Sequence, residues 1–282
     1  MLINLYKTRS VIPGNGNLYL NPSYFGVKQT IILFSSIWLL DTKFAAIFNP
    51  SLLTLMKWSE FFTSSVGKKL VMGLTGLFLI SFLVVHAGIN ACIWANDGGV
   101  MFNKAAHFMG STVVIRILEV GLFVGIFIHI IQGYVLEFTN RSKRGIGYKV
   151  NLGNKGSKWY SRSMGLLGTI LLLFFIIHWK HFWIPSRFTG VNEVMIDGKE
   201  LHNLYNLMQV TFAEPWVVIV YVLACFSLAW HLMHGFQSAF RTIGVHNKRF
   251  LGIIQAAGTG FAIIVPLAFA MMPVSMYLQW VK

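Results

Sequence analysis

Four histidines lie inside long apolar runs of this 282-residue sequence, one in each run. They are His86, His129, His178 and His231. A neutral imidazole carries one hydrogen-bond donor and one acceptor, so placing it in an apolar medium is costly unless something satisfies both. One such residue would suit an ordinary core position, but four in consecutive runs need a shared explanation. Because imidazole is the commonest metal ligand among side chains, metal binding is the first chemistry to test.

The apolar runs themselves have the length of membrane spans. The chain is 55% hydrophobic and 11% charged, against roughly 25% charged in an ordinary soluble domain. Runs of about 20 apolar residues are long enough to cross a bilayer. The sequence therefore predicts an all-α membrane protein with five transmembrane helices in a bundle, near residues 70–93, 112–138, 164–184, 216–240 and 250–278.

Positive charge is concentrated in a few connecting segments, although the net charge is +14. Lys and Arg cluster before the first span, between the second and third, and after the fourth, whereas the other two connections are mixed or acidic. By the positive-inside rule, the three basic segments and the N-terminus are cytoplasmic. No basic face is interleaved with aromatic residues, so nucleic acid is not predicted as a partner.

This topology sorts the four histidines into two depths. Each one lies in the second half of its span, and the spans alternate in direction. His86 and His178 therefore share a level near the outer face, and His129 and His231 share a level near the inner face. At 1.5 Å per residue the two levels are roughly 10–20 Å apart. Two histidine pairs at two depths are what two stacked haems with two axial histidines each require.

Small residues near the inner pair favour the same interpretation. Gly121 and Gly125 precede His129 on its own helix face, and Ser227 and Gly235 flank His231 at four residues on either side. Small residues leave room for a flat macrocycle. They also permit close helix packing in ordinary membrane bundles, and glycines alone favour that explanation.

The N-terminal part of the chain has a different composition. Residues 1–55 combine a Gly-, Pro- and Asn-rich stretch with an apolar run of about 12 residues, which is short for a span. We interpret 1–55 as an extension outside the working domain, either non-native or disordered, and 56–282 as the five-helix domain. Met56 is a plausible natural start.

Four motifs in order resemble a known family. They are SSVGKKLVMGLTGLFL with VVHAGIN, FIHIIQGYVLEFTNRSKR, SRSMGLLG with FFIIHWKHFW, and HLMHGFQSAFRTIG. The chain resembles the five-helix, di-haem cytochrome b membrane-anchor subunit of succinate dehydrogenases and fumarate reductases, in the b558 branch of these succinate:quinone oxidoreductases. The resemblance covers about residues 61–282. The extension has no counterpart in the family.

The resemblance implies a function and a set of partners. It implies a membrane-anchor and electron-transfer subunit of a succinate:menaquinone oxidoreductase in the bacterial cytoplasmic (inner) membrane. Electrons would pass between an iron–sulfur subunit and menaquinone through two haem b groups. Succinate or fumarate would react on a separate flavoprotein subunit, and the quinone would react on this chain, in which no catalytic acid–base residues are predicted.

The resemblance also implies a ligand set. His86 and His178 would hold the outer (distal) haem, and His129 and His231 the inner (proximal) haem, as axial ligands of the iron. His181 and His234 are spare histidines that compete with His178 and His231 for these roles. They could instead bond haem propionates or serve the quinone site.

Charged residues at the ends of the spans are further candidates for the cofactor site. Arg116 and Glu119 are three residues apart, so they can pair with each other or bond a distal propionate, and a role in proton transfer is an equally good alternative. Arg162, Lys69 and Arg241 at the inner border are either propionate partners or topology signals. His107, on the outer side, is a weaker candidate for the quinone site.

Two other functions compete with this reading. One is the di-haem cytochrome b anchor of another respiratory oxidoreductase, of the hydrogenase or formate dehydrogenase type. The other is a transporter with histidine proton relays, which would predict discontinuous helices and internal repeats that the sequence does not clearly contain.

Overall fold

The computed structural model describes residues 62–144, 158–245 and 247–281. The predicted extension 1–55 lies outside the described residues. The structure is mostly helical, at 84%. Five helical spans within the described ranges are long and apolar enough to cross a membrane, which identifies a multi-pass membrane protein. They are Ser65–Ala95, Val113–Lys143, Met164–Thr189, Pro215–Thr242 and Lys248–Tyr277.

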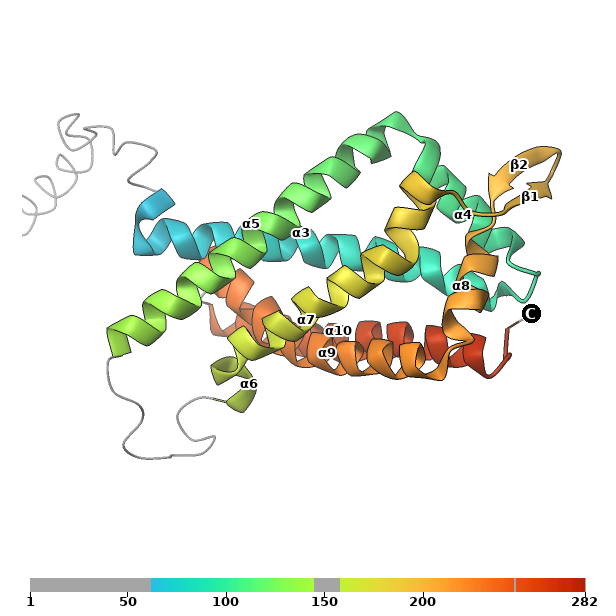
Figure 1. Ribbon diagram of the computed structural model, residues 1–282. Coiled ribbons are helices and arrows are strands. Elements are labelled where there is room, and N and C mark those ends of the chain that lie inside the picture. Colours follow the sequence, from blue (N-terminus) through green and yellow to red (C-terminus); the bar gives the residue numbers. More distant parts are fainter. Residues whose placement is uncertain (1–61, 145–157, 246, 282) are drawn as a thin grey trace, which may run out of the picture. The chain divides into compact units, whose positions relative to one another are not determined.

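The elements follow one another along the chain as shown in Figure 1. The helices that build the spans are α3 (Ser65–Ala91), α5 (Val113–Arg144), α7 (Met164–His178), α9 (Pro215–Thr242) and α10 (Lys248–Tyr277). The shorter helices are η1 (Cys92–Ala95), α4 (Val100–Ser111), α6 (Trp159–Arg162), η2 (Trp179–Trp183), η3 (Pro185–Thr189) and α8 (Leu204–Phe212). Helix α9 packs against α10, α3 and α7, and α3 also packs against α5.

The starts of the long helices have local causes. The Ser64 hydroxyl accepts a hydrogen bond from the Gly67 N–H at 2.9 Å, which caps α3. The side chain of Asn247 accepts from the Arg249 N–H at 2.9 Å and caps α10. Pro215 occupies the first turn of α9, where its missing N–H costs nothing.

The third span differs from the uniform helix that the sequence predicts. Its α-helical part ends at His178, and two π-helical turns, η2 and η3, extend the span to Thr189. Pro185 has no N–H to donate and its ring crowds the preceding turn, so it cannot continue an α-helical hydrogen-bond ladder. The Gly190 N–H bonds the Pro185 carbonyl five residues back, at 3.0 Å. Single π-helical turns are frequent at functional sites.

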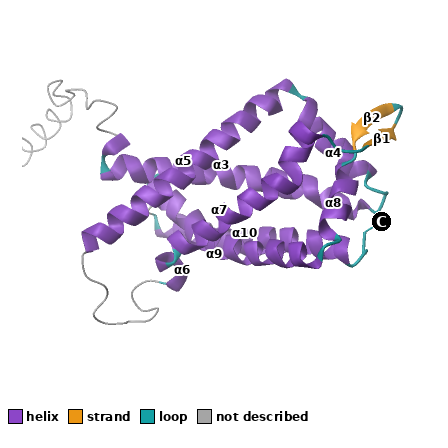
Figure 2. Cartoon of the chain, in the orientation of Figure 1, coloured by secondary structure: helices purple, strands orange, loops and turns teal. Residues whose placement is uncertain are grey.

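The connection between the third and fourth spans contains the one described departure from an all-α fold. Strands β1 (Glu193–Ile196) and β2 (Lys199–His202) form an antiparallel hairpin, shown in orange in Figure 2. Asp197 and Gly198 turn the chain, with φ of 48° and 72°. Asp-Gly is a preferred pair for a two-residue hairpin turn because both positions need positive φ. The sequence therefore contains a turn signal for this hairpin, although the predicted fold has helices alone.

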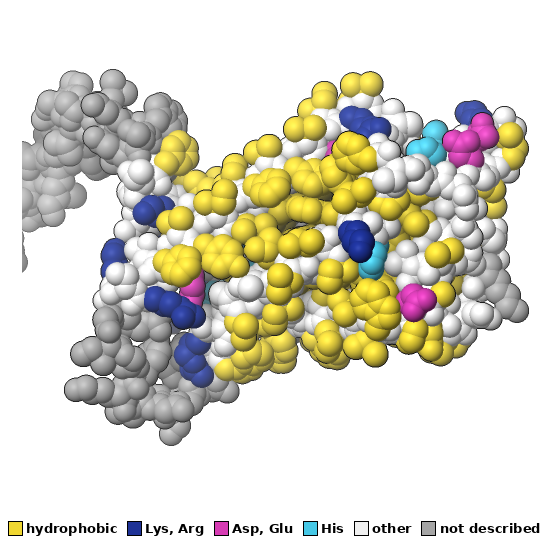
Figure 3. Space-filling model, viewed as in Figure 1, with side chains coloured by type: hydrophobic (Ala, Val, Ile, Leu, Met, Phe, Trp, Pro, Cys, Tyr) yellow, Lys and Arg dark blue, Asp and Glu magenta, His cyan; other side chains and the backbone are white. Residues whose placement is uncertain are grey.

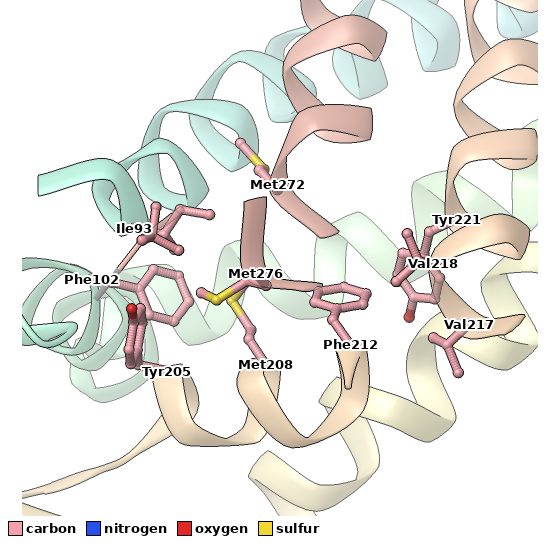
Figure 4. Packing of buried hydrophobic residues seen from close by; sticks show 11 residues of the cluster. Ile93, Phe102, Tyr205, Met208, Phe212, Val217, Val218, Tyr221, Met272 and Met276 are labelled. Carbon is pink, nitrogen blue, oxygen red and sulfur yellow. The ribbon is translucent and has the colours of Figure 1, made fainter. Parts of the chain in front are cut away.

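A hydrophobic core lies at one end of the spans. Side chains from η1, α4, α8, α9 and α10 converge there (Figure 4). Phe212 and Tyr205 of α8 are each 3% exposed, and Met276 of α10 belongs to the same cluster. Asn103 of α4 is also buried, and its amide bonds Asn203 and the Tyr205 N–H. A buried amide with its hydrogen bonds satisfied is compatible with tight packing.

The two ends of the spans differ in charge, because one is strongly basic and the other mixes acidic and basic residues. Lys and Arg cluster where α3 starts, α5 ends and α6 lies, and Asp and Glu gather at the other end, in the hairpin and in the connections before α4 and α9, with an apolar belt between (Figure 3). We call these the basic end and the acidic end. At the acidic end the acids are Asp97, Glu193, Asp197, Glu200 and Glu214. Few residues of the spans are buried within the protein. The side chains on the outer faces of the spans are apolar and exposed, and those on the inner faces line a cavity.

Candidate functional site

A large cavity lies among the spans. Its volume is about 2030 Å³, and residues of α3, α5, α7, α9 and α10 line it. Pockets for one small ligand usually measure about 300–1,000 Å³, so this cavity has room for more than one. All four histidines singled out in the sequence line it: His86, His129, His178 and His231.

His86 of α3 and His178 of α7 form the pair nearer the acidic end, which we call the acidic-end pair. Their ring centres are 5.9 Å apart and their planes meet at 89°. Aromatic rings enclose both. Phe82 stacks on His86 at 5.1 Å and Phe174 stacks on His178 at 5.5 Å. Phe269 of α10 approaches His86 from a third side, at 5.4 Å.

His129 of α5 and His231 of α9 form the second pair, which we call the basic-end pair. Their ring centres are 6.2 Å apart and their planes meet at 61°. Glycines of neighbouring helices lie against these rings. A Cβ added to Gly76 would lie 3.6 Å from His129 Cε1, and one added to Gly168 would lie 3.9 Å from His231 Cε1. The side chains therefore lie in the two pairs that the helix topology predicts.

The residues present fit a metal held between two histidines. Metal–nitrogen bonds are about 2 Å long, so two imidazoles whose ring centres are about 6 Å apart would have room for one ion between them. Edge-to-face packing of two aromatic rings gives similar spacings. Nδ1 of His178 and Nδ1 of His231 are buried without a hydrogen-bond partner in the described chain. With Nδ1 enclosed by the chain, Nε2 is the ring nitrogen that a group bound in the cavity would contact.

The spare histidines have other partners. His181 lies on the η2 turn, where its ring stacks on Tyr221 at 5.9 Å and its Nδ1 is 3.2 Å from the Tyr221 hydroxyl. The Nδ1 of His234 is 2.9 Å from the Ser161 hydroxyl of α6. Neither ring takes the place of His178 or His231 in a pair. The geometry thus favours His178 and His231 over their neighbours.

The small residues singled out in the sequence divide into different roles. Gly125 packs against Phe78 of α3, and Ser227 donates a hydrogen bond to the Leu167 carbonyl of α7 at 3.0 Å. Both therefore serve close helix packing. Gly235 lines the cavity and a Cβ there would meet open space, whereas Gly121 is exposed and does not line it. Gly76 and Gly168, which contact the basic-end pair, were not singled out because they lie on other helices than the histidines they touch.

Glu119 is the centre of a polar cluster between the second and third spans. Arg116 Nη1 lies 3.3 Å from its carboxylate, as the spacing predicts. Arg187 donates to both carboxylate oxygens at 3.1 Å, and Trp183 Nε1 donates at 2.7 Å. A planar guanidinium that bonds both oxygens holds a carboxylate firmly. Arg187 was expected in a loop, and the π-helical extension of the third span is what brings it here.

The other charged candidates lie at the basic end. Lys69 and Arg241 line the cavity. Arg162 lies in α6 with an exposed side chain and is not among the residues that line it. At the opposite end His107 of α4 lines the mouth of the cavity.

Two hairpin carboxyls also line that mouth. Glu193 and Glu200 are close enough to share a hydrogen bond, which raises the pKa of the Glu200 carboxyl above its ordinary value. His202, opposite Glu193 in the hairpin, lines the mouth too. The acidic end of the cavity is therefore bordered by proton-binding groups.

Comparison with family models, with characterised proteins and with solved structures finds no match for this chain.

Proposed function

We propose that the chain is the membrane-anchor and electron-transfer subunit of a succinate:menaquinone oxidoreductase. The proposal rests on a single observation: two pairs of histidines lie at two levels of one large cavity between membrane spans. The motif resemblance supplies the identity of the complex. The proposed site residues are His86 and His178 for one haem b and His129 and His231 for the other.

The residues of this chain would bind and orient the two groups. When bound, the haems supply one-electron redox chemistry, which side chains cannot perform. The aromatic rings around the acidic-end pair exclude water, and the glycines beside the basic-end pair leave space for a flat ring. Lys69 and Arg241, on the cavity wall at the basic end, can neutralise acidic groups of a cofactor there. Arg116, held beside Glu119, would play the same part at the acidic end.

The charge distribution supports the proposed orientation. Lys and Arg at the basic end, among them Lys68, Arg141 and Lys158, support a cytoplasmic location for that end under the positive-inside rule. The iron–sulfur and flavoprotein subunits would dock there. The acidic end would face the opposite side, with the menaquinone reaction near the acidic-end pair. The basic-end haem would then be the first to exchange electrons with the iron–sulfur subunit.

Purification of the complex from its membrane tests the proposal. A reduced-minus-oxidised spectrum should show two b-type haems per chain, and a flavoprotein and an iron–sulfur protein should co-purify. A complex without b-type haem would overturn the haem assignment. Two haems with a hydrogenase or formate dehydrogenase subunit in place of the flavoprotein would assign the chain to another respiratory complex.

A further inference from the structure

One ligand histidine has a hydrogen-bond partner on a different helix. His129 Nδ1 lies 3.1 Å from the hydroxyl of Thr75, which belongs to α3. The two residues are 54 positions apart in the chain. His129 lines the cavity, and so does Gly76, the residue next to Thr75, where an added Cβ would lie 3.6 Å from His129 Cε1. The contact is therefore a tertiary one, made only when α3 packs against α5.

The direction of this bond follows from the rest of the network. A threonine hydroxyl has a single proton. In Thr75 that proton is directed to the backbone of its own helix, with the Val71 carbonyl at 2.8 Å and the Met72 carbonyl at 3.2 Å. With its proton on the helix backbone, the Thr75 hydroxyl accepts from the imidazole, and this arrangement corresponds to the tautomer of His129 with the proton on Nδ1. Nε2 keeps its lone pair.

From this network we infer that Thr75 is a positioning residue that prepares His129 as a metal ligand. A histidine ligand usually donates its second ring N–H to a fixed acceptor, which sets the tautomer and the ring orientation and raises the basicity of the ligand nitrogen. Thr75 is such an acceptor, and it is itself fixed by its bond to the α3 backbone. The inference rests on the proposed function, because it assigns Thr75 to the haem held by the basic-end pair.

The other three ligand candidates lack an equivalent acceptor among the described side chains. Nδ1 of His178 and Nδ1 of His231 are buried without a partner. Asn90 lies 3.3 Å from Nδ1 of His86, but through its amide nitrogen, which is a donor and already bonds the His86 carbonyl at 2.8 Å. His129 is thus the histidine that side chains hold in a ligand-ready state.

The test compares Thr75→Val with Thr75→Ser in the intact membrane complex. Valine keeps the shape and removes the acceptor, whereas serine keeps the hydroxyl. Thr139→Val is a matched control, because the Thr139 hydroxyl also bonds its own helix, at the Val135 carbonyl, and does not line the cavity. The readouts are haem content, the midpoint potential of each haem and the low-spin ferric EPR signals, none of which is enzyme activity.

In Thr75→Val we expect affinity for one of the two haems to fall about tenfold, the lower range for loss of a partner of a metal ligand. The potential of that haem should rise, because a less basic ligand stabilises the ferric ion less. A tenfold change in preference between the two oxidation states corresponds to about 59 mV. The second haem, Thr75→Ser and Thr139→Val should match the unaltered complex.

Two results would overturn the inference while leaving the proposed function intact. One is a Thr75→Val complex with both haems bound at unaltered potentials. The other is a Thr75→Ser complex that shifts as much as Thr75→Val, since a hydroxyl would then not be what matters. Absence of b-type haem from the unaltered complex would instead overturn the proposed function itself.

Discussion

The two histidine pairs are held by different physical means. The acidic-end pair is enclosed by Phe82, Phe174 and Phe269, and the last two of these pack against the hydrophobic core. The basic-end pair is bordered by Gly76 and Gly168 and is fixed on one side by a single tertiary hydrogen bond. Packing against aromatic rings therefore holds the acidic-end pair in place. The basic-end pair has open space beside it, and one hydrogen bond holds the ring of His129. Changes of volume and changes of hydrogen bonding should consequently affect the two pairs differently.

Removal of one ligand from each pair is the strongest test of the comparison. His129→Ala should lose one haem and retain the other, and His178→Ala should lose the other one, because each ring is half of one pair. The haem-to-protein ratio and the spectrum of each purified variant measure this. Loss of the same haem in both variants, or retention of both haems in either, would break the assignment of two independent pairs.

Filling the space beside the basic-end pair should have the next largest effect. Gly168→Leu places a branched side chain where even a Cβ already lies in contact with the His231 ring. We expect loss of most of the basic-end haem and retention of the acidic-end haem. Gly168→Ala should be tolerated, since its Cβ would be at ordinary contact distance, 3.9 Å. Gly252→Leu, at a glycine with open space around it, is the control for helix position, and haem content is again the measurement.

Weakening the core should act on the acidic-end pair. Phe212 is 3% exposed and packs against Tyr221 and Phe182, which in turn contact His178. Phe212→Ala should lower the free energy of unfolding by about 3–5 kcal/mol and broaden the EPR signal of one haem. Phe188→Ala, at a position 72% exposed, should change stability little. Thermal unfolding in detergent measures both. An equal loss of stability in the two variants would contradict the proposed role of the core.

The smallest effect is expected at Asn90. Its amide is a donor that already bonds a backbone carbonyl, so it cannot accept a proton from the His86 ring. Asn90→Ala should therefore change the affinity and potential of the acidic-end haem by less than Thr75→Val changes those of the basic-end haem. Redox titration of the two variants side by side gives the comparison. A larger shift in Asn90→Ala would show that the acidic-end pair also depends on a polar partner.

Much of the fold could be predicted because membrane spans obey simple counting rules. The five spans were expected from apolar length, and the structure begins and ends each of them within five residues of the prediction. The hairpin was missed, although Asp197 and Gly198 are a recognisable turn pair. Helices α4 and α8 were also missed, because such short elements are stabilised mainly by the packing shown in Figure 4.

For the candidate site, too, some features could be predicted from the sequence and others could not. The level of each histidine along its helix follows from residue number and span direction alone, since an α-helix rises 1.5 Å per residue. Which side chains surround it does not follow, because that depends on how each helix is rotated and which neighbour it meets. The contact of Gly168 with His231, the bond from Arg187 to Glu119 and the bond of Thr75 with His129 all join different helices.

The sequence by itself therefore determined that the chain spans a membrane, which connecting segments are basic, and at which two levels the histidines lie. These properties depend on composition and on position along a single helix. Only the tertiary structure decided that π-helical turns bring Arg187 beside Glu119, that aromatic rings enclose one histidine pair, and that Thr75 is the acceptor for His129 in the other. Those outcomes depend on the rotation and contact of helices distant in the chain, which no periodicity within one segment encodes.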